Sequence, residues 1–330
     1  MTRRNIVPRI AAAVAVLALA GAGARAETSL RLLSGWTPNN PNVPNIETVF
    51  IKNVEAASKG QIKIQRSGPE VASPFDQLQP VSAGAFDILF TTPAYHQAQT
   101  GVGQVFDAIK GDIDKRREAG LVAWADDYYN KKYGLRILTV HSAPGNHFVL
   151  RETLKSGQPL EGLKVRTTPT FDGVVRLLGG TPVNMSPADA YAAMQKGTID
   201  GITFPSFASA DYKLYEVGKF MTRPTFGLTN VLMLVNARKL AALPAEHQKI
   251  LLDEGKKLEF IGKKALDEVA KRDEETMLKN GVKVVNFDAA IAGKLNGLYN
   301  EGIFRTASRA TPAEVKTFWD LAKSKGMLNE

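Results

Sequence analysis

The stretch Gly162-Leu163-Lys164-Val165-Arg166-Thr167-Thr168-Pro169 reads as a short apolar strand that ends in a polar turn, with an arginine at the boundary. Strand ends that face a cleft are where α/β proteins keep their ligands. Arginine is well suited to hold a carboxylate, because its guanidinium donates two parallel hydrogen bonds. If Arg166 faces a cleft, the protein captures small organic acids. The alternative is a salt bridge at the surface or between two lobes.

Around this stretch, strand-like and helix-like segments alternate along the chain. This alternation predicts an α/β fold with a mainly parallel sheet in each of two lobes. The longest helical pattern runs from Pro244 to Lys279, with apolar residues repeating along one side. The predicted strands cover residues 29–33, 61–65, 86–90, 135–140, 147–150, 163–166, 199–204, 230–235 and 282–285.

The first 26 residues have the features of a secretory signal peptide. Arginines at positions 3, 4 and 9 precede an apolar run over residues 10–20, and Ala24-Arg25-Ala26 matches an A-x-A cleavage site. The run is too short to span a bilayer. We therefore expect cleavage after Ala26 and a periplasmic protein. Loss of this segment lowers the formal net charge from +9 to +5, because it contains four arginines and no acidic residue.

The composition and the motifs exclude several classes of function. The chain contains no cysteine, so disulfides, a cysteine nucleophile and a thiolate metal site are ruled out. It has no G-x-S-x-G, H-E-x-x-H or P-loop pattern, and its four histidines show no metal-ligand spacing. We therefore predict no enzymatic activity, no cofactor and no metal-ligating residues, while the sequence leaves open whether a metal ion accompanies the ligand. Nucleic acid is not an expected partner, because the basic residues are scattered among acidic ones.

Several longer motifs make the chain resemble the solute-binding proteins of tripartite ATP-independent periplasmic (TRAP) transporters, of the DctP type. The match covers essentially the whole chain after residue 26. It is clearest in Leu160-Glu161-Gly162-Leu163-Lys164-Val165-Arg166, in residues 178–183, and in residues 190–201, which end in Gly197-Thr198-Ile199-Asp200-Gly201. Residues 58–64 and 81–88 also fit. The resemblance implies that Arg166 forms a salt bridge with the substrate carboxylate.

The resemblance also implies a fold and a mechanism. The expected fold is a two-lobed periplasmic binding protein, type II-like, with a hinged cleft and a long helix linking the lobes, for which residues 244–279 are the candidate. Lobe I is expected to comprise residues 27–143 and 232–271, and lobe II residues 144–231 and 272–330. A monomer would capture an organic acid anion, close on it, and deliver it to the small and large subunits of a membrane permease.

Two positions depart from the pattern of family members that bind sugar acids and dicarboxylates. In many of those proteins the Asp-Gly pair is followed by a polar run with an asparagine that contacts the ligand, whereas here Phe204 occupies that position. Some relatives carry a second arginine a few residues before Arg151, where this chain has Gly145-Asn146-His147. These departures predict a less polar pocket, suited to a monocarboxylate with an apolar or aromatic body.

The other candidates for the pocket wall lie in or beside turns that follow predicted strands. Loops at strand ends carry binding residues in many folds. For each aromatic residue the alternative is packing within its own lobe, and for each histidine it is a structural or exposed position. Besides Arg166 and Phe204, the candidates are Trp36, Thr92, Tyr95, Thr168, Phe171, Arg151 and His147.

Three other functions stay open on the sequence alone. The chain could be a binding protein for another class of importer or for a sensor kinase. It could be a periplasmic enzyme on a similar two-lobed scaffold, although no nucleophile or metal motif favours this. It could also be a structural or interaction protein that binds no organic acid.

Overall fold

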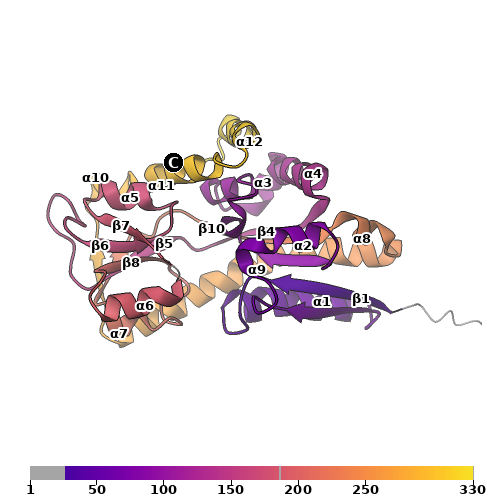
Figure 1. The fold of residues 1–330 in the computed structure, drawn as a ribbon, viewed down its shortest axis with the longest axis horizontal. Coiled ribbons are helices and arrows are strands. Elements are labelled where there is room, and N and C mark those ends of the chain that lie inside the picture. The colour runs from indigo at the N-terminus through magenta and orange to yellow at the C-terminus, as the bar shows by residue number, and fades with distance from the viewer. Residues whose placement is uncertain (1–26, 186, 330) are drawn as a thin grey trace, which may run out of the picture.

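The computed structural model describes residues 27–185 and 187–329. The predicted signal peptide lies outside the described residues. The chain folds into two sheets with helices packed around each, and the sheets form two lobes that lie side by side (Figure 1). This arrangement confirms the predicted two-lobed α/β fold.

The first sheet has the strand order β2-β1-β3-β10-β4. Strand β1 pairs in parallel with β2 and β3, whereas β10 is antiparallel to both β3 and β4. Its strands are β1 (Thr28–Ser34), β2 (Ile62–Ser67), β3 (Ile88–Thr91), β4 (Leu135–Ala143) and β10 (Thr229–Asn236). The inner strands are largely buried, whereas the edge strand β2 buries only two of its six residues.

The second sheet has the strand order β11-β9-β5-β8-β6-β7. Strand β5 is antiparallel to β8 and β9, and the other neighbours are parallel. Its strands are β5 (Asn146–Leu150), β6 (Lys164–Thr167), β7 (Thr181–Asn184), β8 (Gly201–Pro205), β9 (Phe220–Arg223) and β11 (Lys283–Asn286).

Both sheets are mixed, but the expectation of mainly parallel sheets is confirmed: in the first sheet β10 alone runs against the other four strands, and in the second sheet β5 alone runs against the other five. The chain passes from one lobe to the other directly between strands, from β4 to β5 and from β9 to β10. A parallel neighbour requires a long crossover connection, usually a helix, whereas an antiparallel neighbour does not. The strands that enter a sheet straight from the other lobe, β5 and β10, are accordingly antiparallel to their neighbours.

Helices and short helical turns cover the two sheets. The first lobe carries η1 (Val43–Glu47), α1 (Thr48–Ala57), η2 (Pro74–Asp76), α2 (Leu78–Ser82), η3 (Pro93–His96), η4 (Gly103–Ala108), α3 (Ile113–Glu118), α4 (Leu121–Tyr133) and α8 (Ala237–Ala242). The second sheet is accompanied by α5 (Asp172–Leu177), α6 (Pro187–Gln195) and α7 (Leu214–Val217), and the chain continues in α9 (Ala245–Lys279), α10 (Ala289–Ala292), α11 (Leu295–Ala307) and α12 (Pro312–Ser324).

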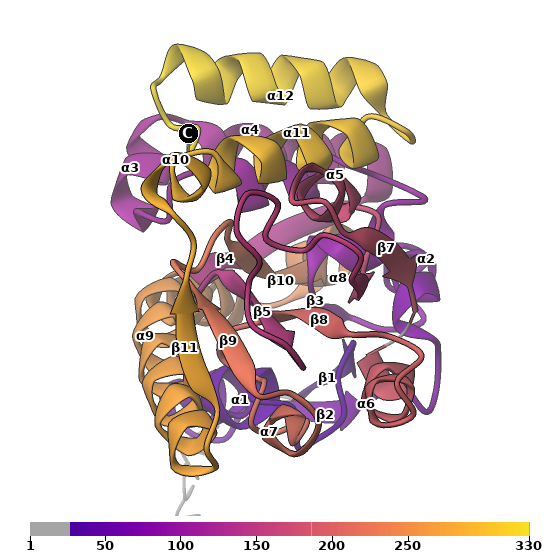
Figure 2. The ribbon, with the colours of Figure 1, turned by 90° about the vertical axis from the view of Figure 1, so that its left-hand side faces the viewer.

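The 35-residue helix α9 links the two lobes (Figures 1 and 2). At 1.5 Å per residue it is about 52 Å long. Its first half packs against β4, where Gly255 and Gly262 allow close approach because a Cβ at either position would collide with β4. Its second half is tied to the other lobe, since the Asp273 carboxylate accepts from the Ala210 N–H at 2.8 Å and Glu274 pairs with Arg223 at 2.7 Å.

The last helices of the chain contact elements of both lobes. Helix α11 packs against α5 and η4, and α12 packs against α4 and η4; Figure 2 shows both helices along one side of the molecule. The lobe boundaries expected from the sequence stay a prediction. None of the described helices combines the length and the apolar character needed to cross a membrane.

Candidate functional site

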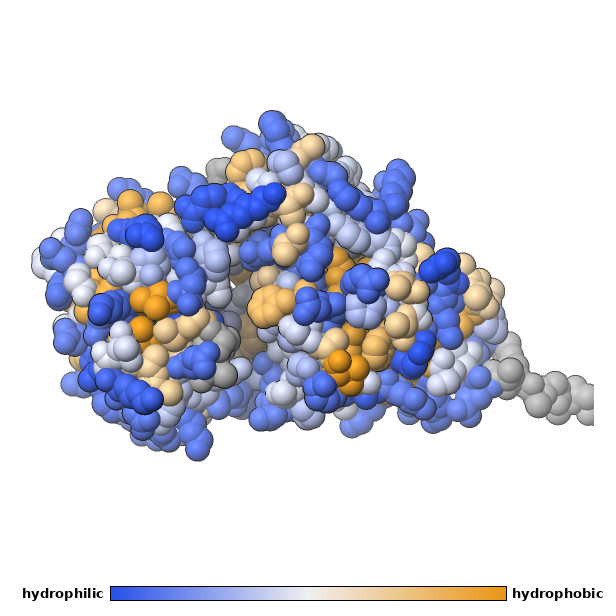
Figure 3. Space-filling view, viewed as in Figure 1, coloured by the Kyte–Doolittle hydropathy of each residue, from blue (hydrophilic) through white to orange (hydrophobic). Residues whose placement is uncertain are grey.

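A cavity of about 190 Å³ lies where the two lobes meet, and it is lined from both sheets. The surface is hollowed between the lobes in the space-filling view (Figure 3). The first lobe contributes loops after β1 and β3 together with η4 and β10, and the second contributes β5, β6, β8 and the segments after them. Ligands of α/β proteins bind at such strand ends. The main polar and aromatic lining groups are Trp36, Asn40, Asn42, Thr92, Tyr95, Gln104, Asp107, Asn146, Arg166, Thr168, Thr170, Phe171, Thr203, Phe204, Tyr212, Thr229 and Tyr299.

Arg166 is the cation of this cavity. It lies on β6 and is 5% exposed. Its Nε donates to the Met185 carbonyl at 3.0 Å and its Nη1 donates to the Thr203 carbonyl at 3.2 Å. None of the described residues accepts from Nη2, and none forms an ion pair with this guanidinium. Two backbone carbonyls therefore orient the side chain and leave one edge of it available to a ligand.

The electrostatics of Arg166 favour an anionic ligand. Burial lowers the pKa of Arg166 to about 10, and the neighbouring Tyr212 and Tyr95 offset this in part. The guanidinium therefore remains charged at neutral pH while it is largely removed from water. A buried charge without a counter-ion is costly, and a carboxylate that docks on it removes part of that cost.

Aromatic side chains form much of the cavity wall. The Arg166 guanidinium carbon lies 6.0 Å from the centre of the Phe204 ring, at the outer limit of a cation–π contact. Phe204 meets Tyr212 edge-on at 4.9 Å between ring centres. In the first lobe, Trp36 contacts Tyr95 at 6.1 Å. Such rings offer flat apolar surfaces on which a planar or cyclic ligand body can lie.

A buried ion pair holds the loop that carries Trp36. Arg66 on β2 donates to the carboxylate of Glu47 and to the backbone carbonyl of Trp36. Glu47 is fully buried, and burial raises its pKa, whereas hydrogen bonds from Ser34 and the charge of Arg66 act in the other direction. The indole is thus fixed against Phe90, at 4.9 Å between ring centres, and is presented to the cavity.

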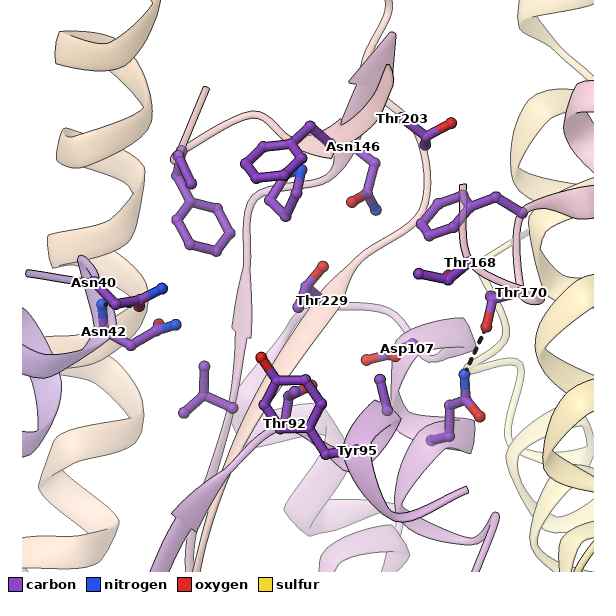
Figure 4. Close-up of a pocket in the computed structure, with 18 of the residues that line it drawn as sticks. Asn40, Asn42, Thr92, Tyr95, Asp107, Asn146, Thr168, Thr170, Thr203 and Thr229 are labelled. Atoms are coloured by element: carbon purple, nitrogen blue, oxygen red, sulfur yellow. Dashed lines mark hydrogen bonds between the residues drawn. The ribbon is translucent and has the colours of Figure 1, made fainter. Parts of the chain in front are cut away.

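Several polar atoms of the cavity wall have no partner within the described part of the chain. They are Asn42 Oδ1, Thr92 Oγ1, Gln104 Oε1 and Thr203 Oγ1, and all four are buried. Figure 4 shows Asn40 and Asn42 on one side of the cavity and Thr168 and Thr170 on another, with the Gln104–Thr170 hydrogen bond dashed. Buried polar groups are normally paired, so these atoms are suited to hydrogen-bond a ligand or the water around it.

Seven of the residues singled out in the sequence come together here. The structure places Arg166, Trp36, Thr92, Tyr95, Thr168, Phe171 and Phe204 on the one cavity. Trp36, Thr92 and Tyr95 follow β1 and β3, which run parallel, so that their C-terminal ends lie at the same edge of the sheet. Phe171 also packs against Tyr299 of α11, at 5.1 Å between ring centres.

Arg151 lies outside the cavity. It follows β5 and is exposed, and its Nη1 reaches the Met194 carbonyl at 3.5 Å. It belongs to a separate surface hollow with Tyr191, Gln195 and Glu216. Strand β5 ends beside α6 and α7, so Arg151, which follows it, does not reach the cavity between the lobes.

His147 is buried beside the cavity without lining it. Its Nε2 is paired with the Ser209 hydroxyl at 2.7 Å, and its Nδ1 with Arg223 at 3.1 Å. Burial, with a smaller effect of Arg223, lowers the pKa of His147 to about 3. Side chains alternate across a strand, so on β5 the neighbouring Asn146, and not His147, faces the cavity.

Sequence reasoning missed several lining residues. Strand alternation could have found Asn146 beside His147, and the turn-rich loop after Trp36 could have drawn attention to Asn40 and Asn42. Nothing local indicated Asp107 or Tyr299, because tertiary packing brings η4 and α11 to the cavity. Over residues 27–185 and 187–329, no group of three or more histidine or acidic side chains is placed to hold a metal ion.

Comparison with known proteins agrees with this architecture. A family model described as bacterial extracellular solute-binding protein, family 7 (DctP), matches residues 34–296. The 2,3-diketo-L-gulonate-binding periplasmic protein YiaO of Escherichia coli (strain K12) is 26% identical over 230 residues. That alignment spans 68% of this chain and 64% of YiaO, so the chain matches slightly less than two thirds of the length of this relative.

Solved structures share the fold at low sequence identity. A TRAP periplasmic solute binding protein from Desulfovibrio salexigens, with bound orotic acid, gives a TM-score of 0.75 at 17% identity, covering 90% of this chain and 98% of that chain. DctP7 from Bordetella pertussis, an extracytoplasmic solute receptor binding pyroglutamic acid, gives 0.74 at 17% identity, covering 90% and 99%. The resemblance seen in the sequence is therefore confirmed, and the chain belongs to bacterial extracellular solute-binding protein family 7, the DctP-type solute-binding proteins of TRAP transport.

Proposed function

We propose that this protein is the periplasmic binding component of a TRAP transporter and that it captures an organic acid through Arg166. The acid would be delivered to the small and large subunits of a membrane permease. Export by the N-terminal segment, with cleavage after Ala26, and a monomeric state belong to the same proposal. The family is one of extracellular solute-binding proteins, which supports a periplasmic location.

One observation carries this proposal. Arg166 is buried in a cavity between two lobes, is held by two backbone carbonyls, and has no acidic partner among the described residues. A buried arginine with a purely structural role normally has all its donor nitrogens satisfied by carboxylates or carbonyls. A guanidinium with an edge left open in a cavity is placed to bind an anion.

The relatives support the chemical class of the ligand. YiaO is named for 2,3-diketo-L-gulonate, and the two solved structures bind orotic acid and pyroglutamic acid. All three compounds carry a carboxyl group. The ring-lined wall of the present cavity supports the narrower proposal of a monocarboxylate with an apolar or aromatic body, although amide and hydroxyl groups are also present.

Binding would proceed by closure of the lobes over the acid. Closure excludes water from around Arg166, which strengthens the attraction between guanidinium and carboxylate in the lower local dielectric. The test is calorimetric titration of wild-type protein and Arg166→Ala with acids selected by a thermal-shift screen of mono-, di-, keto- and aromatic carboxylates. Loss of one partner of a desolvated ion pair costs about 3–5 kcal/mol, so we expect binding to weaken by roughly a hundredfold or more. Wild-type affinity in Arg166→Ala would remove Arg166 from the site.

Two alternatives are separated by simple observations. An enzyme on this scaffold would convert the bound acid, so recovery of the acid unchanged after long incubation supports a pure binding protein. A binding protein for another importer or for a sensor kinase would have different gene neighbours. A paired small and large membrane subunit supports the TRAP assignment.

A further inference from the structure

Asp107 is an acidic group on the same cavity as Arg166. It comes from η4, far in sequence from β6, and is 4% exposed. Figure 4 shows its carboxyl group at the cavity, in the same view as Thr229 and Tyr95. A cavity that holds both a guanidinium and a carboxyl group presents two chemically distinct contacts to one ligand.

A network of buried groups fixes the Asp107 carboxyl. Its Oδ1 accepts from the backbone N–H and from the Nδ2 of Asn230, both at 2.8 Å. Arg116 Nη1 donates to Asn230 Oδ1 at 2.7 Å. Because Arg116 can only donate, the Asn230 amide is oriented with its oxygen toward Arg116 and its nitrogen toward Asp107.

Arg116 is itself held in place. Its Nε donates to the Lys110 carbonyl at 2.7 Å, and its Nη2 donates to the carbonyls of Phe106 and Ile109. Both Arg116 and Asn230 are fully buried. The carboxyl of Asp107 therefore stands on a rigid support and is oriented before any ligand arrives.

The second oxygen of Asp107, Oδ2, receives no hydrogen bond from the described residues. Burial raises the pKa of Asp107 to about 7, while Asn230 and the charge of Arg116 act in the other direction. Asp107 lines the cavity, so a ligand that shields this oxygen from water without supplying a donor would leave it unfavourably unpaired. A ligand that brings an O–H or N–H group to this oxygen would supply the missing donor.

We propose that the site selects monocarboxylates that also carry an O–H or N–H donor, with the carboxylate on Arg166 and the donor on Asp107. This inference rests on the proposed function. A second carboxylate at the Asp107 position would meet a like charge, so dicarboxylates are disfavoured. The cavity of about 190 Å³ is slightly larger than a cavity of about 150 Å³ that holds benzene. The ligand class is therefore an acid of about one ring with a donor substituent.

The test compares matched acids by calorimetry at pH 8, above the pKa of Asp107. One series is benzoate, 3- and 4-hydroxybenzoate, isophthalate and terephthalate; the other is cyclopentanecarboxylate and pyroglutamate. In wild-type protein, we expect the donor-bearing member to bind about tenfold more tightly than its plain partner, as for a hydrogen bond to a charged group. The dicarboxylates should bind more weakly than benzoate. Failure of every panel member to bind wild-type protein at millimolar concentration would overturn the one-ring class.

Two variants assign the preference to its residue. Asp107→Asn keeps an oxygen for the Asn230 N–H groups and removes the charge, so we expect the tenfold preference to fall to threefold or less and dicarboxylates to gain affinity. Asp112→Asn makes the same charge change at the exposed N-cap of α3, and asparagine also caps helices well, so it should behave as wild type. Thermal denaturation of each variant reports whether it is folded.

The outcomes separate this inference from the proposed function. No donor preference in wild-type protein, an equal loss for all acids in Asp107→Asn, or the same change in Asp112→Asn would overturn the selection by Asp107 and leave Arg166 intact. Unchanged binding of all acids by Arg166→Ala would instead overturn the carboxylate site itself.

Discussion

Two buried arginines, Arg116 on α3 and Arg166 on β6, differ in what their donors reach. Burial lowers the pKa of both to about 10. Asp107 offsets part of this lowering for Arg116, and Tyr212 does so for Arg166. Arg116 makes four hydrogen bonds through all three of its nitrogens. Within the described part of the chain Arg166 makes two, and its Nη2 has no acceptor there. Burial and pKa are therefore alike for Arg116 and for the proposed ligand-binding Arg166, and the unused donors at the cavity are what set Arg166 apart.

The strongest way to break this comparison is to make the same substitution at both positions. Arg116→Met removes a fully buried side chain and its four hydrogen bonds, to Asn230 Oδ1 and to three backbone carbonyls, so we expect the free energy of unfolding to fall by about 3 kcal/mol or more. Arg166→Met removes a poorly solvated charge along with two hydrogen bonds, so stability without ligand should change by about 1 kcal/mol or less. Urea unfolding measures both. Equal destabilisation would show that Arg166 is structural too.

The variant Arg166→Lys separates charge from geometry, because it keeps the positive charge but loses the planar guanidinium. A lysine ammonium cannot make the paired parallel hydrogen bonds of a guanidinium to a carboxylate. For Arg166→Lys we expect binding roughly tenfold weaker than wild type, between wild type and Arg166→Ala. Isothermal titration with the best acid of the screen measures this. Affinity as low as that of Arg166→Ala would mean that charge alone contributes little.

The Arg116 region also contains a buried carboxyl group, and this gives it a distinct pH dependence. The pKa of Asp107 is raised from 3.8 to about 7 on folding. The folded protein therefore holds an extra proton between these values, and this contribution to stability is lost as pH rises through 7. Relative to Asp107→Asn, wild-type protein should lose unfolding free energy between pH 5 and pH 8, by at most about 1.4 kcal/mol per pH unit. Parallel stability curves for the two proteins would contradict the raised pKa.

The smallest effect is expected at a third arginine. Arg151 is exposed, lies outside the cavity, and makes one long contact with the Met194 carbonyl. For Arg151→Ala we expect affinity within about twofold of wild type and stability within about 0.5 kcal/mol. The same titration used for Arg166→Ala is the measurement. A tenfold loss would mean that Arg151 contacts the ligand in a state of the protein other than this one.

Much of the fold could be predicted because its signals are local. The apolar repeat from Pro244 to Lys279 predicted α9 almost to the residue, and the short apolar runs predicted most strands. The pairing of strands was not predictable in this way. Whether β10 lies parallel or antiparallel to β3 depends on how the chain crosses between the lobes, which no local pattern encodes. The edge strand β7, with no buried residue, also carried no apolar signal.

The residues of the candidate site show the same contrast between local signals, which the sequence contains, and tertiary packing, which it does not reveal. Trp36, Thr92 and Tyr95 follow parallel strands, and that topology brings strand ends together, so position in the sequence was informative. His147 drew attention where its neighbour Asn146 lines the cavity, because a one-residue shift on a strand reverses the face. Asp107 comes to the cavity through the packing of η4, and its role follows from Asn230 and Arg116, residues 123 and 9 positions away.

The position of Trp36 has a spectroscopic consequence. The chain has three tryptophans; Trp124 stacks on Phe318 at 4.8 Å and Trp319 meets Phe304 at 5.1 Å, and neither lines the cavity. An acid that enters the cavity changes the surroundings of only one indole, so intrinsic fluorescence reports occupancy without any label. Replacing Trp124 and Trp319 by phenylalanine would leave a protein whose emission comes from the wall of the cavity alone.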